Sequence, residues 1–322
     1  MHLQSTPAAR GGRSARVALA VYSNSPTMRV LGTIFAGLLG LAFGSFLNVC
    51  LSRWPPGESV VKPRSHCRQC DHTLSWWENI PLLSWLALRG RCRTCRAWIG
   101  WRYPLVELAV GTLWAAAAWS FLANVFDPDL RRIALYDASL AVLGLMLFYW
   151  LLVALAVLDA QNLWLPDWLT LPGILLGFIF TVVRARLFYE LTYDLGPPNP
   201  PLMTGVSACL FAILAAAGLI LLIRWLYKLI RHREGIGLGD AKLMALLAAW
   251  LGLPGALLAF GLGVVLGALA ALVMLAIPAA RRTDDRWAVQ KLPLGAFLCI
   301  GGIVSSLWGQ PILAAYLRWS GF

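Results

Sequence analysis

The sequence predicts an all-α fold, a polytopic membrane helical bundle. Of its 322 residues 59% are hydrophobic and only 13% are charged, and the mean hydropathy is +0.70. Soluble domains are nearer a quarter charged. The formal net charge of +12 does not indicate nucleic-acid binding, because the arginines cluster in short segments between apolar runs, as topology signals do.

The apolar runs predict about eight transmembrane helices, since a helix needs about 20 apolar residues to cross a bilayer. Residues 243–279 carry no charge, and one helix of that length would reach about 55 Å. We therefore expect a break at Leu253-Pro254-Gly255, which gives a short sixth and a full seventh span. The other spans are expected at 30–51, 104–126, 138–158, 163–183, 202–223 and 292–317.

Four segments follow from these spans. Residues 1–28 are polar and arginine-rich, and we interpret them as a disordered tail or as the product of a start codon assigned too early. The expected order continues with a first transmembrane helix at 29–52, a small polar subdomain at 53–103 and a transmembrane core at 104–322.

Positive residues orient the bundle. Lys and Arg concentrate in 53–102, 224–242 and 281–291, and with eight spans these segments and the turn at 159–162 fall on one side. Loops rich in Lys and Arg remain in the cytoplasm. That side is therefore predicted to be cytoplasmic, with both termini outside.

Four cysteines in the polar insert form two pairs, Cys67-x-x-Cys70 and Cys92-x-x-Cys95. This spacing is typical of a structural zinc site, in which each pair fills two corners of a tetrahedron. A cytoplasmic location disfavours disulfides, and so small an insert needs metal to fold. A redox dithiol and unlinked thiols are the alternatives. His66 and His72 are possible substitute ligands, but we interpret them as bystanders.

Three acids lie near apolar runs on the predicted cytoplasmic side, namely Asp159, Asp167 and Asp240. Two carboxyl groups brought together cannot both ionise cheaply, so one can act as an acid while the other activates water. Asp159 with Asp240 is the favoured pair, and Asp167 is interpreted as a helix cap or a supporting group. In the alternative reading, Asp240 caps its helix and Asp159 is an ordinary helix-end residue in water.

Several neighbours of these acids are candidate supporting residues. Gly237 and Gly239 precede Asp240, and glycines permit unusual turns and a close approach of another segment. Lys242 could hold a nearby acid ionised or anchor to headgroups. Glu107, one turn into the second span, is either structural or a contact for substrate or cofactor.

Five motifs stand in register over roughly residues 35–310, namely 44–49, the insert segments within 77–107, Leu158-Asp159 with Leu165-Pro166-Asp167, 235–243 and Leu292-Pro293-Leu294-Gly295. Together they resemble the bacterial type IV prepilin peptidases, which are Gly-x-Gly-Asp membrane aspartyl proteases. The closing segment Leu292-Pro293-Leu294-Gly295 has Ala296 where the family usually has proline.

The resemblance implies an inner-membrane enzyme that cleaves the basic leader of prepilins and type II secretion pseudopilins on the cytoplasmic side. It implies that Asp159 and Asp240 are catalytic and that Cys67, Cys70, Cys92 and Cys95 hold zinc. It further implies methylation of the new amino terminus with S-adenosylmethionine, at a site that the motifs do not locate. The alternative is an ion-coupled transporter or channel with a zinc-stabilised regulatory insert, in which carboxylates would face both sides or lie mid-span.

Overall fold

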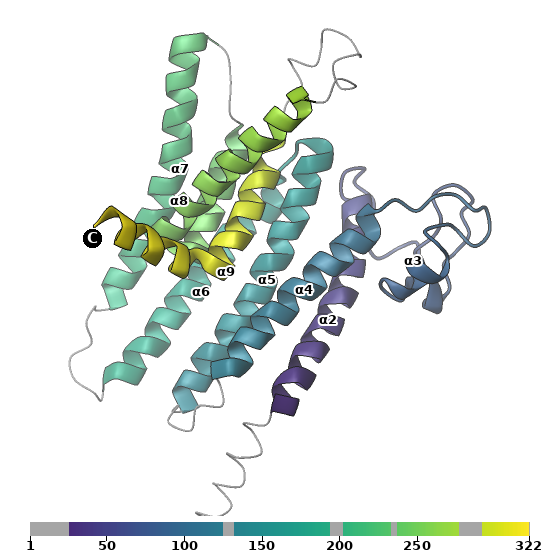
Figure 1. Ribbon diagram of the computed structural model, residues 1–322, viewed down its shortest axis with the longest axis horizontal. Coiled ribbons are helices and arrows are strands. Elements are labelled where there is room, and N and C mark those ends of the chain that lie inside the picture. Colours follow the sequence, from purple (N-terminus) through teal and green to yellow (C-terminus); the bar gives the residue numbers. More distant parts are fainter. Residues whose placement is uncertain (1–25, 125–131, 194–201, 233–236, 277–291, 322) are drawn as a thin grey trace, which may run out of the picture. The chain divides into compact units, whose positions relative to one another are not determined.

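The computed structural model describes residues 26–124, 132–193, 202–232, 237–276 and 292–321, so the predicted tail lies almost wholly outside the described residues, as does the basic segment 281–291 (Figure 1). Seven helices in the described part are long and apolar enough to cross a membrane. The expected all-α class is confirmed, because only two isolated β-bridges occur among these residues. The long helices are α2 (Pro26–Arg53), α4 (Arg102–Asn124), α5 (Arg132–Asn162), α6 (Asp167–Tyr193), α7 (Leu202–Arg231), α8 (Leu238–Ala276) and α9 (Leu294–Ser320).

Of the helix boundaries that differ from the sequence expectation, two have a local explanation. The fourth span begins at Asp167 and not at 163, because Leu163 takes a left-handed φ of 50° and Pro166 follows in the turn. The fifth helix continues to Arg231, so the basic stretch from 224 is largely helical. A helix that leaves the bilayer has no reason to end at the boundary when its residues are good helix formers.

The chain folds as two compact units. Unit 1 holds the described residues up to Phe46 and those from His66 to Met146, and unit 2 holds Leu47–Ser65 and the described residues from Leu147 onward. The insert expected at 53–103 is therefore divided. Its cysteine-bearing part belongs to unit 1, with the short helices η2 (Trp76–Asn79) and α3 (Leu83–Ala87).

Glycines bring α2 and α4 together in unit 1. A Cβ at Gly44 would lie 2.7 Å from Glu107 Cα, and a Cβ at Gly40 would lie 2.9 Å from Gly111 Cα. The pairs run in opposite directions along the two helices, so the helices are antiparallel (Figure 1). Small residues let membrane helices approach closely where hydrophobic burial gives no driving force.

In unit 2, α8 is broken at Gly252, which has a φ of 69° and a ψ of 175°. The break lies one residue before the Leu253-Pro254-Gly255 segment at which the sequence predicts it. Contacts with α9 show that the chain reverses there, because the two arms run in opposite directions along that helix. The chain first follows α9 away from its start, with Leu247 at Gly302 and Gly255 O accepting from Ser305 Oγ, and then returns, with Ala259 at Gly301 and Gly263 at Leu298. The short sixth and longer seventh spans are these two arms.

The first arm of α8 is the centre of unit 2. Residues 243–249 are all buried, and a helix that is apolar all round belongs in an interior. At its end the Trp250 ring lies between Phe148 and Phe180, with centroid distances of 5.2 and 5.4 Å, and Trp250 Nε1 donates to Gly173 O at 3.0 Å. This packing fixes the arm that carries Asp240 at its other end.

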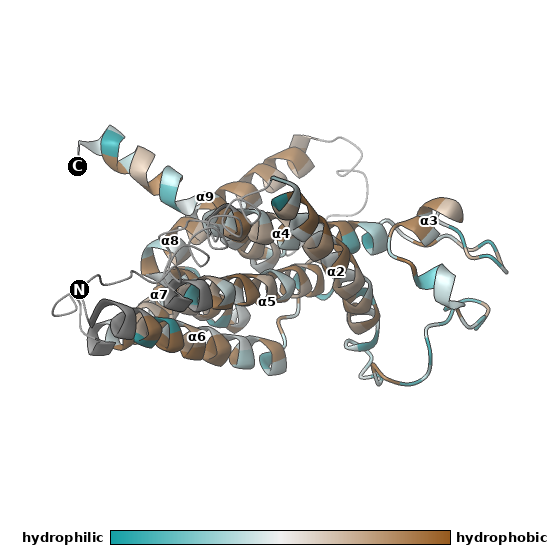
Figure 2. Cartoon of the chain, turned by 90° about the horizontal axis from the view of Figure 1, so that it is seen from below, coloured by the Kyte–Doolittle hydropathy of each residue, from teal (hydrophilic) through white to brown (hydrophobic). Residues whose placement is uncertain are grey.

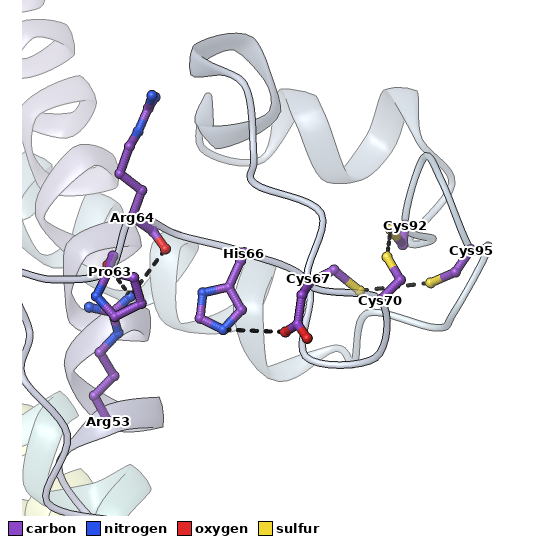
Figure 3. A network of polar contacts seen from close by, with 9 residues as sticks. Arg53, Pro63, Arg64, His66, Cys67, Cys70, Cys92 and Cys95 are labelled. Atoms are coloured by element: carbon purple, nitrogen blue, oxygen red, sulfur yellow. Dashed lines mark hydrogen bonds and ion pairs between the residues drawn. The ribbon is translucent and has the colours of Figure 1, made fainter.

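Unit 2 also holds the segment that leaves α2. The guanidinium of Arg53 is buried and donates to Ser59 O at 2.8 Å and to Pro63 O at 2.7 Å (Figure 3). A buried charge needs such partners. Arg53 therefore holds the 54–64 segment in a fixed path.

Candidate functional site

Asp159 is buried in the last turn of α5. Its Oδ2 accepts a hydrogen bond from Ala296 N at 2.8 Å. Gly295 and Ala296 are the second and third residues of α9, so their N–H groups have no partner within the helix. The positive end of a helix suits a carboxylate. The reading of Asp159 as an ordinary helix-end residue in water is therefore wrong, because its exposed fraction is only 6%.

Asp240 is the third residue of α8 and is also buried, with an exposed fraction of 9%. Its Oδ2 accepts from Gly237 N at 3.2 Å. A side chain at this position that reaches back to the residue before the helix is the acidic half of a capping box. Asp240 thus contributes to capping its helix. Capping alone does not explain why the Asp240 side chain is buried, because a capping residue can lie at the surface.

The structure brings Asp159 and Asp240 together at one end of unit 2. The Leu165 side chain lies between their supports: its Cδ1 is 3.1 Å from a Cβ built at Gly239 and 3.0 Å from one built at Gly295. The two carboxyl groups are close enough to interact electrostatically. Two acids in an apolar surrounding cannot both ionise cheaply, so the pair can hold one proton between them.

Gly237 and Gly239 have specific roles in this arrangement. Neither takes a positive φ, so an unusual turn is not the reason for either glycine. Gly239 has no Cβ because Leu165 approaches it, and Gly237 donates its N–H to Asp240. A closing motion of the 234–240 segment stays a prediction, and residues 233–236 lie outside the described part.

Asp167 and Lys242 form an ion pair beside this site. Lys242 Nζ donates to Asp167 Oδ1 at 2.5 Å, and the Asp167 side chain is 59% exposed. Asp167 is the first residue of α6, where a negative charge is favourable. These two residues are thus paired with each other at the surface, while Asp159 and Asp240 are buried.

The four cysteines of unit 1 form a second candidate site. Their Sγ atoms all lie within 4.8 Å of one another, with Cys67–Cys95 at 3.8 Å and Cys70–Cys92 at 4.0 Å (Figure 3). A zinc ion with Zn–S bonds of about 2.3 Å has tetrahedral edges of about 3.8 Å. The cluster therefore fits a tetrahedral metal ion.

Backbone amides favour the ionised, thiolate form of cysteines in this cluster. The amides of Cys95 and Thr94 point at the Cys92 thiol, and together with the other thiols they lower the pKa of Cys92 to about 6. At Cys70 the His72 amide acts in the same direction, but desolvation and the three neighbouring thiols outweigh it and raise the pKa to about 12. Without a metal ion the four thiols therefore differ in how readily they ionise. A bound cation would favour the thiolate form of all four.

The histidines of the insert face carboxylates. His66 Nε2 lies 4.0 Å from Asp71 Oδ1, and His72 Nε2 lies 3.4 Å from Glu78 Oε2 (Figure 3 shows His66). Burial alone would raise the pKa of Glu78, but the hydrogen bond from the Ser75 amide and the nearby His72 imidazole outweigh it and leave this pKa below its usual value. Among the described residues, the set able to hold a metal contains cysteines only.

Glu107 connects the insert to a membrane helix. It is buried in α4, and its Oε2 accepts from Leu82 N at 2.8 Å. This bond supports the structural reading of Glu107. The reading in which it contacts substrate or cofactor stays a prediction.

The sequence motifs include Gly295 and Leu165, but sequence reasoning did not identify these residues and the Ala296 amide as supports of Asp159. Gly295 offered a signal, because it follows Pro293 by two residues at the start of an apolar run. The sequence cannot show that this helix start meets the end of a helix more than 130 residues earlier, with a separation of 137 between the bonded residues.

Comparisons with known proteins match the two candidate sites with two different family profiles. The profile of the Bacterial Peptidase A24 N-terminal domain matches residues 38–121, which contain the cysteine cluster. The profile of the Type IV leader peptidase family matches residues 146–272, which contain both buried acids. No solved structure matches the chain significantly.

Three relatives that match most of the chain carry the name prepilin leader peptidase/N-methyltransferase. The protein of Stutzerimonas stutzeri is 34% identical over 306 residues, which cover 88% of this chain and 93% of the relative. That of Pseudomonas aeruginosa is 34% identical over 323 residues, with coverage of 93% and 97%. That of Burkholderia pseudomallei strain 1026b is 37% identical over 325 residues, with coverage of 91% and 90%. The chain therefore belongs to the type IV leader peptidase family.

Proposed function

We propose that this protein is a membrane aspartyl endopeptidase that removes the leader peptide of prepilins or pseudopilins and then methylates the new amino terminus. The observation that carries the proposal is the burial of Asp159 and Asp240 together at one end of unit 2. The family membership and the names of the relatives support the substrate class and both activities.

The hydrogen bonds of the two acids indicate which one acts as the general base and which one as the general acid. Asp159 accepts from the amino-terminal amides of α9, which favour a negative charge there, so we assign Asp159 as the base. It takes a proton from a water molecule, whose oxygen bonds to the scissile carbonyl carbon. Asp240 supplies the proton that the departing amine nitrogen takes up as the C–N bond breaks.

The site lies at the end of unit 2 where α5 ends and α8 and α9 begin. The charge pattern of the connecting segments assigns this end to the cytoplasm, and we place the protein in the bacterial inner membrane. The apolar helix of a prepilin would lie in the bilayer, with its basic leader at the acid pair. The transporter alternative is disfavoured, because the two buried acids in the described part of unit 2, Asp159 and Asp240, lie together at one end of that unit.

We assign zinc to Cys67, Cys70, Cys92 and Cys95, with a structural role, because four thiolates leave no open position for water or substrate. Methylation requires a methyl donor, for which S-adenosylmethionine is the expected molecule. Glu107 is engaged by the Leu82 amide, and a contact between Glu107 and substrate or cofactor stays a prediction.

The test uses the purified, zinc-loaded protein in vesicles with a prepilin precursor, without and with S-adenosylmethionine. The proposal expects a product that lacks its leader, and a further product heavier by one methyl group when the donor is present. An intact precursor would refute the peptidase assignment. Cleavage without the mass change would refute the methylation alone. An ion flux without cleavage would favour the transporter.

A further inference from the structure

We propose that the cysteine-bearing part of unit 1, residues 66–101, lies in the headgroup region of the membrane. An apolar patch on its surface holds it there, and anionic phospholipid covers this patch. The patch consists of four apolar side chains whose exposed fractions lie between 55% and 64%, namely Leu83, Leu86, Trp98 and Trp101. Leu83 and Leu86 are three residues apart on α3, so they share a face of that helix. In Figure 2, α3 is coloured brown, as hydrophobic, while the loop segments around it are mostly teal, as hydrophilic.

The depth of the patch follows from one hydrogen bond. Leu82, which precedes α3, donates its N–H to Glu107, and Glu107 lies five residues into α4. Five residues of helix rise about 7.5 Å. Figure 1 accordingly shows α3 beside the first turns of α4. The headgroup layer on each side of the hydrocarbon core is about 5–7 Å thick, so residues at this level meet lipid.

The patch is held rigid before any lipid binds. The Trp85 ring packs on Trp98 and Trp101, with centroid distances of 5.9 and 4.5 Å, and Trp85 Nε1 donates to Ile99 O at 3.0 Å. Gly90, with a φ of 67°, lets these rings close over the backbone, since a Cβ there would lie 2.8 Å from both Trp85 and Trp98. A preorganised surface loses little entropy on binding.

The charges around the patch identify its occupant. Arg89, Arg91 and Arg96 are exposed in the same stretch of chain. Tryptophan with arginine at a helix end is typical of membrane interfaces, and clustered positive charge near the cytoplasmic leaflet attracts anionic lipid. A basic leader peptide would be repelled here. The proposal rests on the membrane spans and not on the proposed catalytic function.

The test places the full-length, zinc-loaded protein in nanodiscs of phosphatidylcholine and phosphatidylglycerol that contain a phospholipid with a photoreactive group near its glycerol. We expect label in residues 82–101 of the wild type. Replacing both leucines, Leu83→Gln with Leu86→Gln, should lower that label more than about tenfold, because two leucine side chains no longer favour insertion. The control Val61→Gln, at an exposed apolar position outside the patch, should leave it unchanged.

Three results would overturn the proposal. One is the absence of label in the wild type, a readout that needs no variant to fold. The second is undiminished label in the double variant with zinc retained. The third is loss of the wild-type label when prepilin is added or when two copies of the chain share a nanodisc, which would show that protein and not lipid covers the patch. Equal labelling in nanodiscs of phosphatidylcholine alone would overturn the choice of anionic lipid.

Discussion

A methyl group at position 295 is the smallest change that should disable the acid pair without removing either acid. In Gly295→Ala the new Cβ would lie 2.9 Å from Asp159 Oδ2 and 3.0 Å from its Cγ. Ordinary contact begins at 3.4 Å, so the carboxylate has to retreat by about 0.5 Å or the start of α9 has to move. Either response lengthens the bond from the Ala296 amide.

The size of the effect follows from that displacement. Overpacking of this kind costs about 1–3 kcal/mol, and about 1.4 kcal/mol corresponds to a factor of ten in rate. A misplacement of about 1 Å can cost about a hundredfold in rate. We therefore expect kcat for leader cleavage to fall about ten- to hundredfold, with a much smaller change in KM because the added atom points at Asp159.

The assay compares steady-state cleavage of a prepilin by the wild type, Gly295→Ala and the control Gly261→Ala. Position 261 has open space where a Cβ would be built, so this control makes the same chemical change in a helix without a clash. The control should keep the wild-type rate. Wild-type kcat for Gly295→Ala, with zinc content and thermal stability unaltered, would refute the proposed support of Asp159.

Three further predictions concern the surroundings of the two sites. Gly239→Ala should slow cleavage, because its Cβ would lie 3.1 Å from Leu165, and adding Leu165→Ala should restore part of the rate in a double-mutant cycle; additive losses would contradict the contact. Cys67→Ser should abolish stoichiometric zinc and expose residues 66–101 to limited proteolysis, and full zinc retention would argue against the tetrahedral cluster. Lys242→Met should change thermal stability by less than about 1 kcal/mol, because its pair with Asp167 is exposed; a larger loss would show that this pair supports the core.

The helices could be predicted from the sequence because a bilayer imposes a minimum length on apolar runs. The break in 243–279 was predictable for the same reason, since no single helix of that length fits the membrane. Its position at Gly252 and the reversal of the chain there depend on how the two arms pack on α9. Packing of this kind joins residues far apart in sequence, so local patterns cannot give it.

The acid pair shows the same limit more sharply. Motifs single out Asp159 and Asp240, and the charge pattern places them on one side of the membrane. The burial of Asp159 depends on the start of α9, and no local feature of the 158–162 segment predicts that contact. The position of Asp167 after a proline made it a plausible supporting residue. Its ion pair with Lys242 could not be predicted, because it depends on the packing of α6 against α8.

The cysteine cluster was the most predictable part of the site. Ligand spacing within each pair fixes two thiols on one turn, and only the meeting of the two pairs requires tertiary structure. The hydrogen bond from Leu82 to Glu107, which attaches the cysteine-bearing segment to α4, could not be predicted. It joins a backbone amide to a side chain 25 positions away.

The central claim is that Asp159 and Asp240 perform the hydrolysis together. It is tested most directly by the rate of leader removal by Asp159→Asn and by Asp240→Asn, each purified with its zinc and given the same prepilin in the same vesicles. Each substitution keeps the size of the side chain but removes its acid–base chemistry, which contributes about a hundredfold to ten-thousandfold. The account predicts that each variant loses at least about a hundredfold in rate. Cleavage at the wild-type rate by either variant would contradict it.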